Sequence, residues 1–107
     1  MSNDVLSRLA ATIKERRTAM PEDSHTRLLL DGAPVMPAKK LGEEAIEVAI
    51  AALAQDKDAL VAEAADLLYH LLVVLESRRV ALDDVLEELE RRMSATALQK
   101  RRKAASR

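Results

Sequence analysis

The sequence predicts an all-α fold, and three features of its composition support this prediction. Alanine (19 residues) and leucine (17 residues) make up a third of the 107 positions, and both residue types favour helices. Residues that favour strands are scarce, since phenylalanine and tryptophan are absent and tyrosine occurs once. Two glycines and three prolines are too few to form the turns of a many-stranded sheet.

The chain length indicates a single domain covering residues 1–107. A monomer of this size buries only about two-thirds of its unfolded surface, so association with a second chain would add to its stability. We therefore expect four main helices and one short helical segment in a bundle that is completed by dimerisation.

The first helix is predicted over roughly residues 3–17, where apolar residues recur with helical spacing. Pro21 interrupts the chain after it, and Ser24 is a suitable N-cap for a short helical segment that ends at Asp31-Gly32. Pro34 marks the following connection, and Pro37 suits the first turn of the next helix.

Two long central helices follow, predicted at about Ala38–Gln55 and Asp58–Arg78. Either Asp56 or Asp58 is expected to cap the second of them. The last helix is predicted to begin near Leu82 and to reach the basic C-terminal tail.

The charge distribution and the absence of cysteine exclude several classes of site. Residues 1–90 carry a formal charge of −8, and the tail from about Arg91 carries +7. Such a tail is more often a solvated helix end than a nucleic-acid site, so we do not expect nucleic-acid binding. Without cysteine there is no thiolate nucleophile and no Cys-ligated zinc. No signal peptide or membrane span is apparent, and we expect a cytoplasmic protein.

The central helices carry carboxylates in otherwise apolar surroundings. In the first, the positions of Glu43, Glu44 and Glu47 fall within one arc of the helix, and the residues from Val48 to Ala54 are apolar on every side. A helix that is apolar all round is predicted to be buried. We therefore expect these carboxylates at the mouth of a buried helix.

The second central helix carries Glu63, Asp66 and His70 on one face, because they are spaced three and four residues apart. Asp66 stands among alanines and leucines, and a buried carboxylate without a partner is costly. If the helices are antiparallel, the pairs Glu44/Glu47 and Glu63/Asp66 face each other. Such a set of oxygens suits Mg²⁺ or Mn²⁺, with a di- or triphosphate as the substrate.

Two segments resemble the phosphoribosyl-ATP pyrophosphohydrolase family of histidine biosynthesis, a branch of the all-α MazG-like pyrophosphohydrolases. They read K-K-L-G-E-E-A-I-E-V from Lys39 and E-A-A-D-L-L-Y-H-L-L from Glu63. The similarity extends over nearly the whole chain, and its paired E-x-x-E and E-x-x-D motifs identify the superfamily. The stretch before Lys39 and the histidine at position 25 depart from the family pattern.

This resemblance implies Mg²⁺-dependent hydrolysis of phosphoribosyl-ATP to phosphoribosyl-AMP and pyrophosphate by a homodimer. It assigns the metal to Glu44, Glu47, Glu63 and Asp66. It makes Glu43, with Glu44 and Glu47, a catalytic candidate, either in the outer shell or as the group that orients water. The implied phosphate contacts are Lys39 and Lys40, with Arg27 a weaker candidate.

Two other functions are compatible with the sequence. The same chemistry could act on a non-standard nucleoside triphosphate or dUTP in a housekeeping role. Alternatively, the chain could be a non-catalytic helical dimer whose basic tail binds nucleic acid or a protein. The roles of Tyr69 and His70 stay open, since either residue could simply lie at a helix interface.

Overall fold

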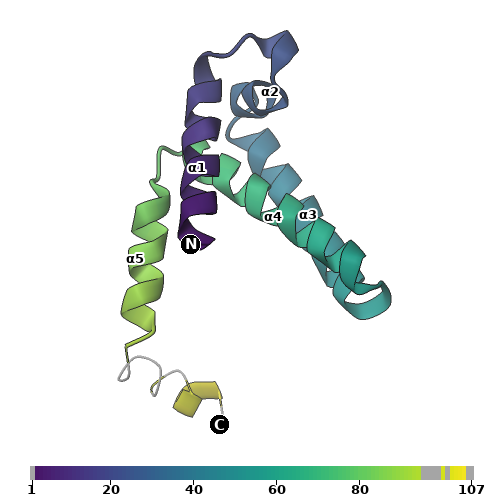
Figure 1. Ribbon diagram of the computed structural model, residues 1–107, viewed down its shortest axis with the longest axis vertical. Coiled ribbons are helices and arrows are strands. Elements are labelled where there is room, and N and C mark those ends of the chain that lie inside the picture. Colours follow the sequence, from purple (N-terminus) through teal and green to yellow (C-terminus); the bar gives the residue numbers. More distant parts are fainter. Residues whose placement is uncertain (1, 95–99, 101, 106–107) are drawn as a thin grey trace.

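The structure is a computed structural model that describes residues 2–94, 100 and 102–105, and this part of the chain contains helices and no strand (Figure 1). Five α-helices follow in order, with two 3₁₀ turns between the first and the second: α1 (Ser2–Glu15), η1 (Arg16–Thr18), η2 (Pro21–Asp23), α2 (His25–Asp31), α3 (Val35–Ala54), α4 (Lys57–Ser77) and α5 (Leu82–Arg92). The prediction of an all-α fold with four main helices and a short one is confirmed. None of the described helices is both long and apolar enough to cross a membrane.

The helix boundaries follow from local signals in the sequence. The Ser24 hydroxyl accepts a hydrogen bond from the Arg27 N–H at 3.1 Å, and the Asp56 carboxylate accepts one from the Ala59 N–H at 2.9 Å. Ser24 therefore caps α2 as predicted, and of the two candidates for α4 it is Asp56, not Asp58, that forms the cap. The start predicted for α3 is three residues late, because α3 begins at Val35 and holds Pro37 within its first turn, where a missing N–H is tolerated.

The hydrophobic core lies where α1 and α2 cover the C-terminal half of α4. Its buried members are Ile13 from α1, Leu29 and Leu30 from α2, and Leu72 and Val73 from α4. An ion pair between Arg17 and Glu76 closes this end, and the same guanidinium donates to the backbone carbonyl of Glu76. The core therefore fixes one half of α4 against the N-terminal part of the chain.

Helices α3 and α4 form a hairpin that extends away from this core (Figure 1). The tight turn between them joins two antiparallel helices whose outer surfaces are not covered within the chain. Leu53 is 89% exposed, Ile46 is 61% exposed and Val61 is 60% exposed. The prediction that the apolar end of α3 is buried is therefore wrong for the single chain, where Ala51 is the only buried residue between Val48 and Ala54.

Helix α5 turns away from the bundle after residues 78–81, and only its start, at Leu82 and Asp83, lies near α1 (Figure 1). It is strongly amphipathic, with Asp83 and Asp84 in its first turn and Arg91 and Arg92 in its last. This order of charges stabilises the helix, because acidic groups lie at the positive end of the helix dipole and basic groups at its negative end. The predicted basic tail lies partly outside the described residues, and within them Arg91 and Arg92 bind Glu88.

Candidate active site

Carboxylates from α3 and α4 converge on the side of the hairpin. Glu44 of α3 and the pair Glu63 and Asp66 of α4 each offer an oxygen, and these three oxygens lie within 4.8 Å of one another. Glu63 and Asp66 share a face because they are three residues apart, and the antiparallel hairpin brings Glu44 opposite them. Three of the four residues predicted to bind a metal are thus brought together.

The fourth carboxylate, Glu47, lies against Glu63. The pKa of Glu63 is raised by desolvation first, and then by the negative charges of Glu47, Glu44 and Asp66 and by a hydrogen bond with Glu47. The other three predicted residues therefore all act electrostatically on Glu63. Mutual repulsion of this kind is relieved when a cation binds, so the donor set fits a hard divalent metal such as Mg²⁺.

The carboxylates are more accessible than the sequence suggested. Asp66 and Glu47 are exposed, and Glu44 and Glu63 are half-buried. The expectation of a buried Asp66 is wrong, because the side of α4 that carries it is not covered by α1 or α2. The convergence of acidic oxygens, rather than burial of one of them, is what now indicates a metal site.

Of the residues predicted to bind phosphate, the two lysines lie on α3 one turn before the carboxylates, and Arg27 makes its contacts elsewhere. Lys40 approaches Glu43, with its Nζ 3.5 Å from a carboxylate oxygen, and Lys39 is exposed on the preceding position of α3. Arg27 is engaged elsewhere, since it donates to Asp31 at 2.9 Å and to the Ala19 carbonyl at 2.7 Å. These two bonds fix the Arg27 guanidinium beside α2.

His70 is a residue whose burial the sequence did not establish. It is 8% exposed, and its Nδ1 atom is buried without a hydrogen-bond partner in the described part of the chain. Burial lowers the pKa of His70, and the cations His25 and Lys40 oppose the effect of Glu44 and Asp66. The spacing of four residues from Asp66 was the one signal that linked His70 to this region.

The neighbouring Tyr69 forms part of the same contact. Its ring meets that of His70 edge-on, with 4.9 Å between the centroids. Its hydroxyl shares a hydrogen bond with the hydroxyl of Thr26, which is buried in α2. Tyr69 and His70 therefore connect the carboxylate-bearing helix to α2, and this is consistent with the helix-interface role considered from the sequence.

Comparison with known proteins agrees with this geometry. The sequence model of the family described as phosphoribosyl-ATP pyrophosphohydrolase matches residues 6–93. A protein of Methylobacterium nodulans named phosphoribosyl-ATP pyrophosphatase is 49% identical over 98 residues, which is 92% of each chain. Proteins of the same name from Caulobacter vibrioides (53% identical, 89% of this chain and 88% of the relative) and Agrobacterium fabrum (52% identical, 92% of each) are similar too. The chain therefore belongs to the phosphoribosyl-ATP pyrophosphohydrolase family.

Proposed function

We propose that this protein hydrolyses phosphoribosyl-ATP to phosphoribosyl-AMP and pyrophosphate in histidine biosynthesis. The observation that carries the proposal is the convergence of acidic oxygens from α3 and α4 within 4.8 Å, in a chain that belongs to this family. The names of the relatives supply the substrate, and the carboxylates supply the means to act on its anionic phosphates.

Glu44, Glu47, Glu63 and Asp66 would hold Mg²⁺, with Mn²⁺ as a possible substitute. When bound, the metal would screen the polyphosphate and polarise its P–O bonds. The carboxylates place their charges on one side of the hairpin, so the triphosphate would have to approach from that side. The number of ions bound is left open by this arrangement.

The remaining site residues would bind and orient the reactants. Lys39 and Lys40 lie one turn before Glu43 and Glu44 on α3, and their ammonium groups would contact phosphate oxygens. Glu43 would orient the attacking water or hold Lys40, to which it already lies close. Arg27 would contribute only if substrate displaced it from Asp31 and the Ala19 carbonyl.

We also propose that the protein is a homodimer in which the α3–α4 hairpins of two copies pack together. Apolar side chains exposed on the hairpin include Ile46, Ile50, Leu53, Val61 and Leu68, which are between 44% and 89% exposed. A small monomeric protein rarely exposes so many large apolar side chains on one helical hairpin. Sedimentation velocity should show a dimer that Leu53→Lys converts to a folded monomer, and a monomeric native protein would refute the assembly.

The cytoplasmic location stays a prediction.

Activity is tested with the purified chain, Mg²⁺ and phosphoribosyl-ATP, with pyrophosphate release as the readout. A parallel panel of nucleoside triphosphates, including dUTP, tests the housekeeping alternative. Rapid release from phosphoribosyl-ATP and little from the panel supports the proposal. Release from the panel alone would replace the substrate, and no release from either would favour the non-catalytic binding protein.

A further inference from the structure

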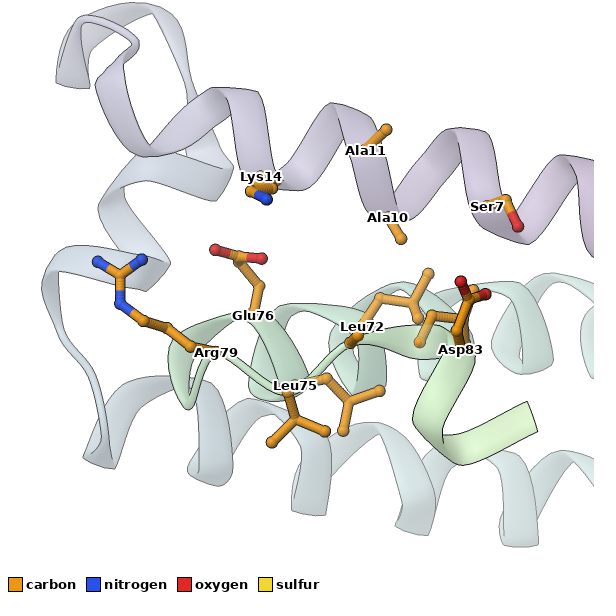
Figure 2. Close-up of a pocket in the computed structure, with 12 residues that line it drawn as sticks. Ser7, Ala10, Ala11, Lys14, Leu72, Leu75, Glu76, Arg79 and Asp83 are labelled. Carbon is orange, nitrogen blue, oxygen red and sulfur yellow. The ribbon is translucent and has the colours of Figure 1, made fainter. Parts of the chain in front are cut away.

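A cavity of about 330 Å³ lies at the end of α4 that is remote from the carboxylates. It is open to solvent on one side and is lined by α1, the end of α4 and the start of α5, and it shares no lining residue with the carboxylate cluster (Figure 2). Its floor is apolar, formed by Ala10, Leu72, Leu75 and Leu82. A cavity of this size is large enough for a small organic molecule.

Four charged side chains line the cavity: Lys14 and Arg79 are basic, and Glu76 and Asp83 are acidic. Figure 2 shows Lys14, Glu76 and Arg79 directed into the same space between α1 and the end of α4. Glu76 is already bound by Arg17 from outside the cavity lining. The side chains of Lys14 and Arg79 take part in none of the ion pairs or side-chain hydrogen bonds found among the described residues. Two cations therefore face the cavity without an anion of their own.

The N-terminal end of α5 also borders the cavity, and Asp83 and Asp84 in its first turn offset part of the positive end of the helix dipole. Ala81 is the N-cap of α5 and provides no side-chain hydrogen bond, and both Ala81 and Leu82 line the cavity. The N-terminal end of a helix carries the positive end of its dipole. Asp83 on the rim is the one acidic side chain besides Glu76 among the lining residues.

The backbone of Arg79 shows that its side chain is held here at a cost. Val80 N–H bonds to the Leu75 carbonyl at 2.9 Å, and Arg79 N–H bonds to the Glu76 carbonyl at 3.0 Å. This is the Schellman ending of a helix, in which the residue after the C-cap is usually glycine. Arg79 instead occupies that position with a φ of 56°. A side chain kept in the left-handed region against its preference points to a role for the guanidinium.

We infer that this cavity is a second binding site, for a small organic anion that has an apolar or aromatic body. Lys14 and Arg79 would bind the anionic group, and Leu72, Leu75 and Leu82 would contact the body. Because the cavity is formed by three helices, the ligand would also join α5 to α1 and α4. The anionic group could be a phosphate ester or a carboxylate, which differ in charge and number of acceptor atoms.

The test uses phenyl phosphate and benzoate as probes, with inorganic phosphate and phenol as the separated halves of the first. Titration of the full-length protein is followed by NMR at the amides of Ala10, Ala11 and Val80. Phenyl phosphate or benzoate should move these signals and bind more tightly than either half alone. The probe that binds more tightly identifies the anionic group as a phosphate ester or a carboxylate.

Two variants give the inference its sharpest form. Lys14→Met should weaken binding about tenfold or more, because it removes a charge-assisted contact. Arg79→Gly should weaken binding similarly while raising the thermal midpoint, because glycine adopts the left-handed conformation without strain. Arg78→Ala is the matched control, since Arg78 is the adjacent C-cap and does not line the cavity.

Three results would overturn the inference. One is the absence of shifts at these amides with either probe at millimolar concentration. Another is binding that Lys14→Met and Arg79→Gly leave unchanged. The third is binding that Asp66→Asn abolishes, which would place the probe at the carboxylates.

Discussion

The two halves of α4 have similar apolar sequences and different surroundings. In the C-terminal half, Leu72 is 4% exposed and Val73 is fully buried beneath α1 and α2. In the N-terminal half, Val61 is 60% exposed and stands beside the carboxylates of Glu63 and Asp66. One half of the helix therefore forms the core, and the other carries the proposed metal ligands and an uncovered apolar surface.

This difference shows that stability and function are separated along one helix. Leu72 and Val73 contact α1 and α2, so substitutions there should change folding. Glu63 and Asp66 lie outside this core and close to Glu44 of α3, so substitutions there should change activity and leave the core intact. The first two predictions below test the two sides of this division, and the others concern elements outside α4.

The largest effect is expected for Asp66→Asn. Loss of one metal-binding carboxylate should lower the rate of pyrophosphate release by at least ~10³-fold, since metal ions contribute several kcal/mol to transition-state stabilisation. Circular dichroism should show unchanged helicity, because Asp66 is exposed. Asp58→Asn is the matched control, in the first turn of the same helix, and should keep full activity. Full activity of Asp66→Asn would refute the metal assignment.

A large effect on folding is expected in the other half of α4. Leu72→Ala leaves a cavity in the core and should reduce the free energy of unfolding by about 2–5 kcal/mol. Leu53→Ala is the same substitution at a residue that is 89% exposed, and it should change monomer stability by less than about 0.5 kcal/mol. Urea unfolding at low protein concentration measures both. Equal losses of unfolding free energy in the two variants would contradict the assignment of Leu72 to the core and of Leu53 to the uncovered surface of the hairpin.

Smaller effects on the free energy of unfolding, opposite in sign, are expected when each of the two glycines is replaced by alanine. A Cβ at Gly42 would meet nothing within 4 Å, so Gly42→Ala should raise the free energy of unfolding by up to about 1 kcal/mol. A Cβ at Gly32 would lie 2.8 Å from the Cβ of Met36, so Gly32→Ala should lower it. Thermal unfolding measures both. Destabilisation by Gly42→Ala would show that the open space beside α3 is filled in the assembled protein.

The smallest effect concerns Glu88 on α5. Hydrogen bonds from Arg91 and then Arg92 lower the pKa of Glu88 to about 2. A lowered carboxyl pKa stabilises the fold above the unfolded value of 4.5, and this contribution is lost as the pH falls from 4.5 toward 2. Wild type should therefore be slightly more helical than Glu88→Gln at pH 6, and the two should converge near pH 2. Glu87→Gln is the matched control, because it leaves Glu88 and its two arginine partners in place and should keep the pH dependence of the wild type.

The sequence predicted the helices and the carboxylate pairs well because their signals are local. Ser24 and Asp56 cap their helices through bonds to residues three positions away. The spacing of Glu63 and Asp66 fixes their common face within one turn. The family resemblance rested on the same local motifs, and the match over residues 6–93 confirms it.

The parts that the sequence did not predict depend on which elements cover which surface. Leu53 and Leu72 are equally apolar, and only the placement of α1 and α2 decides that Leu72 is buried. The same applies to Asp66, which is exposed because nothing in the chain covers its side of α4. Arg27 was a candidate for phosphate binding from its position alone, and its contact with Ala19 depends on the fold of the segment between α1 and α2.

The proposed metal ligands all lie on a single hairpin, and this has a consequence for how the protein folds. Glu44 and Asp66 are joined by one turn, so their repulsion opposes the pairing of α3 with α4 directly. A cation that binds the paired helices and not the unfolded chain shifts the folding equilibrium by mass action. The concentration of free divalent metal would then set how much of the chain is folded as well as how fast it turns over.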